Sequence, residues 1–416
     1  MFKSWNRTEL SWALYDWANS AYALIVMTAF FPVFVGGMIV DPPPGNLNAT
    51  SIVGFANSAA SLLVVLLAPV LGALGDQYGA KRKLLGAFAV LGVLACFSLG
   101  LVERGQPLLA AFVFACGNIG FAAANGLYDA LIVEVTRRER FDRLSAFGFS
   151  LGYAGSLLLF LICIAMTMQP GWFGLADPIA AIRLAFVLVA VWWLVFTIPL
   201  LTAAIDERPL AMPGSSAWRH VRAAFGELWD TLREVRRYRQ AAIFLLAYFL
   251  YMDGVYTVIK MAVVYATALG FTQVVIMTGI VVVQVVAIPA TLAYGGLAGR
   301  FGAKRMIMLG IVAYIVVISG APQMSIPLHF YGLALLIGLA QGGLQSISRS
   351  YYARLIPASE SGKYFGFYNM VGKFATVLGP SLMAVTALII GDRYSILAIP
   401  LLLIAGLILL FFLDDE

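Results

Sequence analysis

The chain has 416 residues, of which 62% are hydrophobic and only 12% are charged. Soluble domains average roughly 25% charged residues, so this composition excludes a soluble globular protein and predicts an integral membrane protein. The net charge of +6 does not indicate nucleic-acid binding, because the basic residues occupy short loops between apolar runs and form no single basic face.

Twelve apolar runs follow one another along the chain. A helix needs about 20 apolar residues to cross the hydrocarbon core of a bilayer, so each run predicts a spanning helix. The runs cover residues 11–38, 51–74, 84–103, 107–135, 144–168, 182–205, 240–266, 273–295, 305–322, 327–350, 364–390 and 394–413. The first run is longer than a signal-peptide core and lacks a small-residue cleavage site, so we expect no removable signal.

Basic residues alternate between the two sides of these spans. The N-terminus and the even-numbered loops hold nearly all of them, at Lys81–Lys83, Arg137–Arg143, Arg208–Arg239, Arg300–Arg305 and Arg349–Lys363. The odd-numbered loops hold only Arg104, Arg183 and Arg393. The positive-inside rule therefore predicts that both termini are cytoplasmic, and we expect a multi-pass protein of a bacterial inner membrane.

The longest loop divides the spans six and six. Apolar residues from Trp218 to Val235 recur at helical spacing between Arg and Glu, which predicts an amphipathic helix on the cytoplasmic membrane surface. We interpret it as a tether between the halves, with a regulatory docking site as the alternative. The predicted domains are an N-terminal six-helix bundle (1–205), this linker (206–239) and a C-terminal six-helix bundle (240–416).

An internal repeat supports two related halves. The loop "GALGDQYGAKRK" (Gly72–Lys83) is matched by "GGLAGRFGAKRM" from Gly295, and "LYDW" (14–17) is matched more weakly by "LYMDG" (250–254). Pseudo-symmetric halves of this kind place a substrate site near mid-membrane between them and rock around it.

These motifs carry a family resemblance along essentially the whole chain. The repeated loop and the six-plus-six topology resemble the major facilitator superfamily. The segments "WALYDWANSAYA", "AFGFSLGYAGS", "YFLYMDGVYTVIKMA" and "QGGLQSISRSYYARLIP" resemble the branch of the vacuolar amino-acid effluxer of autophagy and its bacterial relatives. The resemblance implies an all-α fold of twelve transmembrane helices in two pseudo-symmetric bundles. It also implies secondary transport of a small polar solute by alternating access, with amino-acid efflux as the leading hypothesis. A sugar or drug transporter of the same fold and a non-transporting receptor or scaffold are the alternatives.

Polar residues inside spans 1, 4, 7 and 10 form stripes at helical spacing. Ionisable groups in a spanning helix usually face a cavity or a partner, and the resemblance implies that these four spans line the central cavity. The predicted substrate- and proton-binding residues are Asp16, Asn19, Tyr22, Asn125, Asp129, Asp253, Tyr256, Lys260, Gln341, Gln345 and Lys373.

The acids in this set have structural alternatives. Asp253 is interpreted as one half of a coupled pair with Lys260 or Lys373, which would suit an amino-acid zwitterion or a proton, although a purely structural salt bridge would place it similarly. Asp129 and the nearby Glu134 could instead pair with the Arg137–Arg143 cluster. Span 4 lacks the Arg-Gln-Gly signature of many proton-coupled relatives, so proton antiport stays open.

The repeated loop predicts a gate. Asp76 follows a helix end and is expected to meet a helix N-terminus or an arginine across the cytoplasmic seam. Lys81 and Arg82 belong to the same predicted gate and would also contact anionic lipid. In the second copy Gly299 replaces the acid beside Arg300, so that half should contribute less to gating.

We expect no enzymatic activity and no cofactor. The pattern G-x-S-x-G at 148–152 lies in a predicted spanning helix, without the strand-to-helix turn that a hydrolase requires. The chain has two histidines, its three cysteines lack metal-ligand spacing, and no phosphate-binding loop is present to use ATP. The expected partners are a small-molecule substrate, membrane lipids and, as the candidate coupling ion, protons, with no nucleic acid and a monomeric state.

Overall fold

The computed structural model describes residues 5–38, 49–210, 238–375 and 378–414. Within these ranges all regular structure is helical, and twelve helices are long and apolar enough to cross a membrane. The protein is therefore an integral multi-pass membrane protein. The predicted amphipathic helix between Trp218 and Val235 lies outside the described residues.

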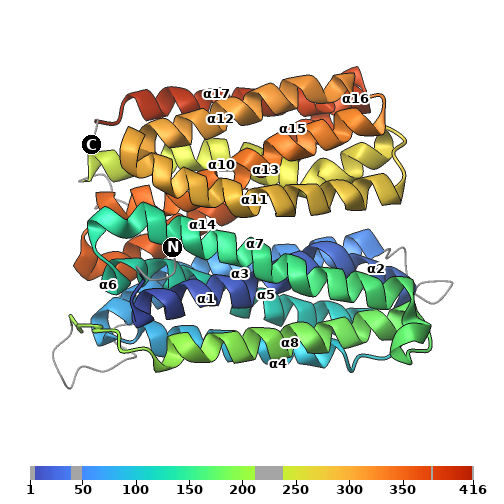
Figure 1. The fold of residues 1–416 in the computed structure, drawn as a ribbon, viewed down its shortest axis with the longest axis horizontal. Coiled ribbons are helices and arrows are strands. Elements are labelled where there is room, and N and C mark those ends of the chain that lie inside the picture. The colour runs from blue at the N-terminus through green and yellow to red at the C-terminus, as the bar shows by residue number, and fades with distance from the viewer. Residues whose placement is uncertain (1–4, 39–48, 211–237, 376–377, 415–416) are drawn as a thin grey trace.

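The N-terminal half contains the first six spans (Figure 1). Its elements are α1 (Arg7–Ala21), the π-helix η2 (Tyr22–Phe30), α2 (Phe31–Met38), α3 (Ala49–Tyr78), α4 (Lys81–Leu99), α5 (Pro107–Ala130), α6 (Ile132–Val135), η3 (Arg138–Arg140), α7 (Phe141–Met168), η4 (Pro170–Phe173) and α8 (Pro178–Thr202). A capping box fixes the start of α1, because Asn6 accepts a hydrogen bond from the Glu9 N–H while Glu9 accepts one from the Asn6 N–H.

The C-terminal half contains the other six spans, in the upper part of Figure 1. Its elements are α10 (Arg239–Ala268), α11 (Gln273–Phe301), α12 (Ala303–Gly320), η5 (Ala321–Gln323), α13 (Pro327–Leu355), η6 (Ala358–Glu360), α14 (Ser361–Phe374), α15 (Leu378–Ile390), α16 (Asp392–Ser395), η7 (Ile396–Ala398) and α17 (Ile399–Phe411). Two features differ from the predicted spans. The tenth helix continues to Leu355, and the eleventh is built from two separate helices, α14 and α15.

The two copies of the repeated loop have the same backbone feature. Gly79 follows α3 with φ +56°, and Gly302 follows α11 with φ +90°. A residue with positive φ lets the chain leave one helix and begin the next at once, and glycine adopts this conformation without a Cβ penalty. The repeat seen in the sequence is therefore a repeated helix-to-helix corner.

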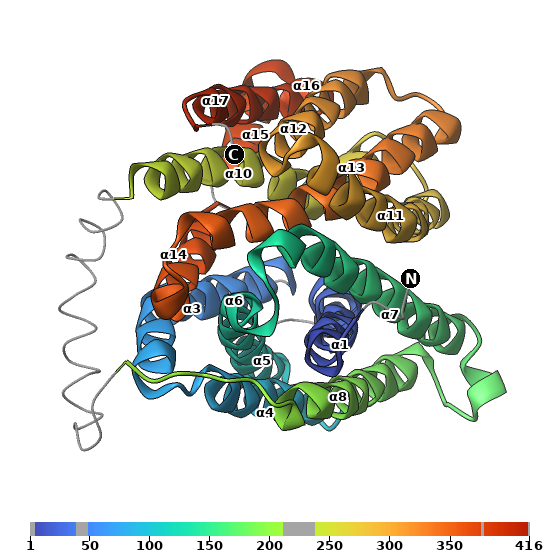
Figure 2. The same ribbon diagram turned by 60° about the vertical axis from the view of Figure 1, so that its left-hand side comes forward.

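The two halves pack closely at the end of the bundle where both chain termini lie, which we name the terminal end. It is on the left of Figure 1, and Figure 2 turns it toward the viewer. There α3 crosses α14 at glycine: a Cβ built on Gly72 would lie 1.9 Å from the carbonyl oxygen of Gly362. On the other side of the seam the Ser145 hydroxyl of α7 donates to the Ser346 carbonyl of α13 at 2.6 Å.

Candidate functional site

A buried arginine joins the two halves in the interior of the molecule, within the last two turns of α13. Arg349 of α13 lies 3.3 Å from Asp16 of α1 and 3.1 Å from Asp129 of α5, measured from guanidinium nitrogen to carboxylate oxygen. Its side chain is 3% exposed. We name these three residues the central triad. One cation from the C-terminal half thus holds two acids of the N-terminal half.

Aromatic and hydroxyl groups fix the guanidinium in place. Its carbon lies 4.5 Å from the ring centroid of Phe149 and 4.7 Å from that of Trp12, close enough for cation–π attraction. The Arg349 Nε donates to the Ser145 hydroxyl at 2.9 Å, and the Tyr128 hydroxyl donates to Asp16 at 2.8 Å. These partners belong to the N-terminal half and hold the guanidinium in one position. The ion pairs of Arg349 therefore depend on how the two halves are placed relative to each other.

Other predicted residues of the N-terminal half form amide contacts beside the triad. The Asn19 amide donates to the Asn125 oxygen at 2.6 Å. Tyr22 is fully buried and donates to Asn118 at 2.9 Å, so it belongs to the core of its own half. Asp129 has a second partner across the seam, because the Asn369 amide of α14 donates to it at 3.3 Å.

The glutamines of span 10 also meet the opposite half. The Gln341 amide donates to the Tyr153 hydroxyl at 3.2 Å, and that hydroxyl donates to Gln345 at 3.4 Å. Tyr153 lies on α7, so these bonds join the two halves further along the seam. Tyr256 is half-buried on α10.

Asp253 has a backbone partner that the sequence did not indicate. Its carboxylate is fully buried, and its two oxygens accept the Gly379 N–H at 3.0 and 3.1 Å. Gly379 lies in the first turn of α15, so Asp253 caps a helix N-terminus, where a negative charge is stabilised by the helix dipole. The charge of Lys260, whose side chain is exposed, acts on Asp253 and also on Lys373. The backbone at the start of α15 is therefore the hydrogen-bond partner of this carboxylate, and Lys260 acts on it through its charge.

We expect Asp253→Asn to weaken the join between α10 and α15 without changing the central triad. Loss of a charged cap costs about 1 kcal/mol or somewhat more, so the melting temperature in detergent should fall by a few degrees. Substrate affinity should stay within about twofold, because the triad is untouched. Gly379→Ala is the matched variant: its Cβ would lie 1.9 Å from the Thr257 hydroxyl and should disturb the same join. A loss of substrate binding in Asp253→Asn with an unchanged melting temperature would instead return Asp253 to the substrate site.

The predicted gate residue Asp76 meets a helix N-terminus across the seam, as expected. Its two oxygens accept the backbone N–H groups of Gly362 at 2.9 Å and Lys363 at 2.7 Å, in the first turn of α14. Lys81 pairs with Asp76 at 2.8 Å, pairs also with Glu134, and donates to the Ser361 hydroxyl at 2.8 Å. We name Asp76, Lys81 and Glu134, together with residues 361–363, the terminal seal. It holds the two halves together at the terminal end.

These contacts correct the expected pairing of Glu134 and show where two predicted gate residues, Arg82 and Arg300, lie. Glu134 pairs with Lys81 and not with the Arg137–Arg143 cluster. Arg82 turns toward its own half, where it contacts Glu207 and the Ala203 carbonyl. Arg300 is exposed and packs over the ring of its neighbour Phe301 at 5.4 Å. Lys81 therefore contacts both halves, whereas the contacts of Arg82 and Arg300 within the described residues are to Ala203, Glu207 and Phe301.

Arg349 is the candidate site residue that the sequence did not single out. It was assigned to the cytoplasmic loop that starts at 349, but α13 continues past it to Leu355. The signal was present in "SISRSYYARLIP", because no glycine or proline interrupts the helical stretch before Pro357. A basic residue inside a span predicts an ion pair with a buried acid, and spans 1 and 4 supply such acids.

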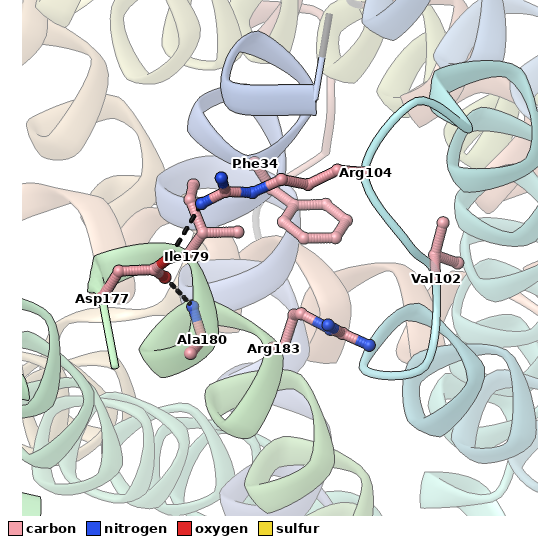
Figure 3. A pocket seen from close by; sticks show the side chains of 7 residues that line it. All are labelled: Phe34, Val102, Arg104, Asp177, Ile179, Ala180 and Arg183. Carbon is pink, nitrogen blue, oxygen red and sulfur yellow. Dashed lines mark hydrogen bonds and ion pairs between the residues drawn. The ribbon is translucent and has the colours of Figure 1, made fainter. Parts of the chain in front are cut away.

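A small cavity near the opposite end lies beside a helix cap and an ion pair. It measures about 80 Å³ and lies beside Arg104 and Asp177 (Figure 3). Asp177 caps α8 through the Ala180 N–H at 2.7 Å and pairs with Arg104 at 2.8 Å. Among the described residues no group of three or more His, Cys, Asp or Glu could hold a metal ion.

Comparisons of sequence point to one family. A family model described as "Vacuole effluxer Atg22 like" matches residues 36–138 and 132–416. The "Uncharacterized MFS-type transporter YxiO" of Bacillus subtilis (strain 168) is 37% identical over 100% of this chain and 97% of its own length. "Autophagy-related protein 22-1" of Aspergillus niger is 28% identical over 64% of this chain, and the match spans 45% of that protein.

Comparisons of structure identify the fold. The proton:xylose symporter XylE, solved with 6-bromo-6-deoxy-D-glucose, superposes with a TM-score of 0.72 at 17% identity, covering 98% of this chain and 95% of that one. FucP in its outward conformation gives a TM-score of 0.72 at 12% identity, covering 98% of this chain and 99% of that one. Both are described as major facilitator superfamily transporters.

Proposed function

The chain belongs to the Atg22-like family of the major facilitator superfamily, and from this premise we propose that it exports amino acids or closely related small polar metabolites. Secondary transport, without regard to the substrate, follows from the family and the fold. The description of the family as effluxers supports the direction. The proposed location is a bacterial inner membrane with cytoplasmic termini, as the distribution of basic residues suggests.

The observation that carries the proposal is the central triad. An α-amino acid has one carboxylate and one ammonium group, and the triad offers a guanidinium beside two carboxylates. A planar guanidinium can take a carboxylate through two hydrogen bonds. The ammonium would then replace the guanidinium as the partner of Asp16 or Asp129.

This exchange would couple substrate binding to movement of the halves. In the observed state Arg349 holds the N-terminal half through Asp16 and Asp129. A substrate that takes over these ion pairs removes one restraint between the halves, while the terminal seal and the bonds between α7 and α13 remain. A ligand shifts such an equilibrium only through its different affinity for the two states, and the exchange of partners supplies that difference.

Protons are the proposed coupling ion. With both carboxylates ionised the triad has one more negative than positive charge, and burial of an unbalanced charge favours its protonated form. A proton on Asp16 or Asp129 would balance the site when no substrate is present. We propose that the protein acts as a monomer in which one chain supplies all these groups.

The test is counterflow by purified protein in proteoliposomes. We expect labelled amino acids to exchange at least about tenfold faster than in empty vesicles, and Asp16→Asn/Asp129→Asn to remove this exchange because the ammonium loses both charged partners. The exposed Glu103→Gln is the matched control and should exchange like the wild type. Exchange of sugars or of lipophilic drugs without amino acids would replace this proposal by the corresponding alternative. Absence of exchange for every solute by folded protein would favour a receptor or scaffold.

A further inference from the structure

A second cavity opens at the terminal end of the seam. It measures about 470 Å³ and is formed by both halves. The N-terminal half contributes residues between Val133 and Phe141, and the C-terminal half contributes residues between Ala353 and Ala358. The central triad, the terminal seal and the proposed substrate groups are not among its lining residues.

The cavity has an excess of positive charge. Arg137, Arg138 and Arg354 line it, and Glu139 is the one acid in the lining. Arg354 is neutralised by Asp142 of α7 at 2.5 Å. Arg138 donates only to a neutral group, the Arg354 carbonyl at 3.0 Å, and Arg137 has no ion pair in the part of the chain that the structure describes. The lining thus sets the two exposed guanidinium groups of Arg137 and Arg138 against one exposed carboxylate, that of Glu139, and keeps a net positive charge.

From this arrangement we propose that the cavity binds an anion bearing a phosphate group, and that the bound anion stabilises the sealed terminal end. Guanidinium groups match phosphate oxygens with paired N–H donors. The anion would relieve the repulsion between Arg137 and Arg138, and it would touch α13 of the other half through the Arg354 side of the cavity. The phosphate could belong to a free anion or to a lipid headgroup, because both present the same oxygens.

The site would act as a regulator of the gate. Its residues come from both halves, so the cavity in this form exists only while the terminal end is closed. A ligand that binds one of two states shifts the population toward it in proportion to its concentration over its dissociation constant. Phosphate-bearing anions should therefore favour the sealed state, whatever solute the transporter carries.

The experiment measures thermal unfolding of purified full-length protein in detergent at constant ionic strength. One arm titrates inorganic phosphate against chloride, and a second adds phosphatidylglycerol against phosphatidylcholine. We expect a saturating rise in melting temperature in at least one arm. Saturation with inorganic phosphate assigns the site to a free anion, and saturation with phosphatidylglycerol alone assigns it to a lipid headgroup.

Variants keep the assignment specific. Arg137→Gln/Arg138→Gln should weaken the apparent affinity at least about tenfold, and Arg137→Lys/Arg138→Lys should recover part of it. The control Arg239→Gln/Arg305→Gln removes two exposed charges outside the cavity lining and should change the affinity less than about twofold. An equal loss in the control, or no saturable stabilisation in either arm, would overturn the proposal.

A second readout tests the effect on the gate. Spin labels on Lys83→Cys and Arg305→Cys, at the starts of α4 and α12 in opposite halves, report the width of the terminal end. The saturating ligand should shift the distance distribution toward the shorter, sealed separation. A ligand that binds with full affinity yet leaves this distribution unchanged would overturn its role in closing the gate.

Discussion

Arg349→Met should abolish transport and lower the free energy of unfolding by about 3–5 kcal/mol, because removal of one partner leaves uncompensated buried charge. The substitution strands Asp16 and Asp129, whose side chains are only 11% and 13% exposed. Methionine fills the space beside Trp12 and Phe149 without offering a donor to either acid. Thermal unfolding in detergent and counterflow in proteoliposomes measure the two effects separately.

A triple variant separates charge from packing. Adding Asp16→Asn and Asp129→Asn to Arg349→Met removes the stranded charges, so most of the lost stability should return while transport stays absent. The exposed Arg305→Gln is the control for loss of one positive charge. Wild-type transport by Arg349→Met would contradict the assignment of the central triad as the site. A triple variant no more stable than the single one would show that the triad is not held by its ion pairs.

Asp76→Asn should open the terminal end and reduce transport at least about tenfold, which corresponds to about 1.4 kcal/mol of conformational free energy. The carboxylate accepts from two backbone N–H groups of α14 and pairs with Lys81. Hydrogen bonds to charged groups contribute about 1.5–3 kcal/mol each, and a neutral amide cannot replace both acceptors. Substrate affinity measured by thermal shift should be retained, because the central triad is separate from the terminal seal.

Glu207→Gln is the matched control for this prediction. Glu207 is an acid of the same region that pairs with Arg82 inside the N-terminal half, so its removal should leave the seam closed. Distances between spin labels at positions 83 and 305 should lengthen in Asp76→Asn and stay unchanged in Glu207→Gln. Equal lengthening in both variants would mean that general charge loss, and not the bond to α14, controls the gate.

The sequence determined the membrane class, the twelve spans, the two related halves and the contact of Asp76 with a helix N-terminus across the seam. These follow from local signals: the length of an apolar run, the placement of basic residues, and a repeated corner around Gly79 and Gly302. Each signal depends only on residues that are close together in the sequence. The bilayer and the water around it are therefore enough to determine which segments cross the membrane and which form loops.

The tertiary structure decided which buried charges meet. Arg349 is 333 residues from Asp16 and 220 from Asp129, and the sequence pattern did not indicate that one guanidinium serves both. The same holds for Asp253, whose partner is the backbone of the eleventh span at the point where that span divides into α14 and α15. In a low-dielectric interior a charge must find a counter-charge or a helix end. The sequence allows several possible partners for each buried charge, and the packing of the helices determines which of them it contacts.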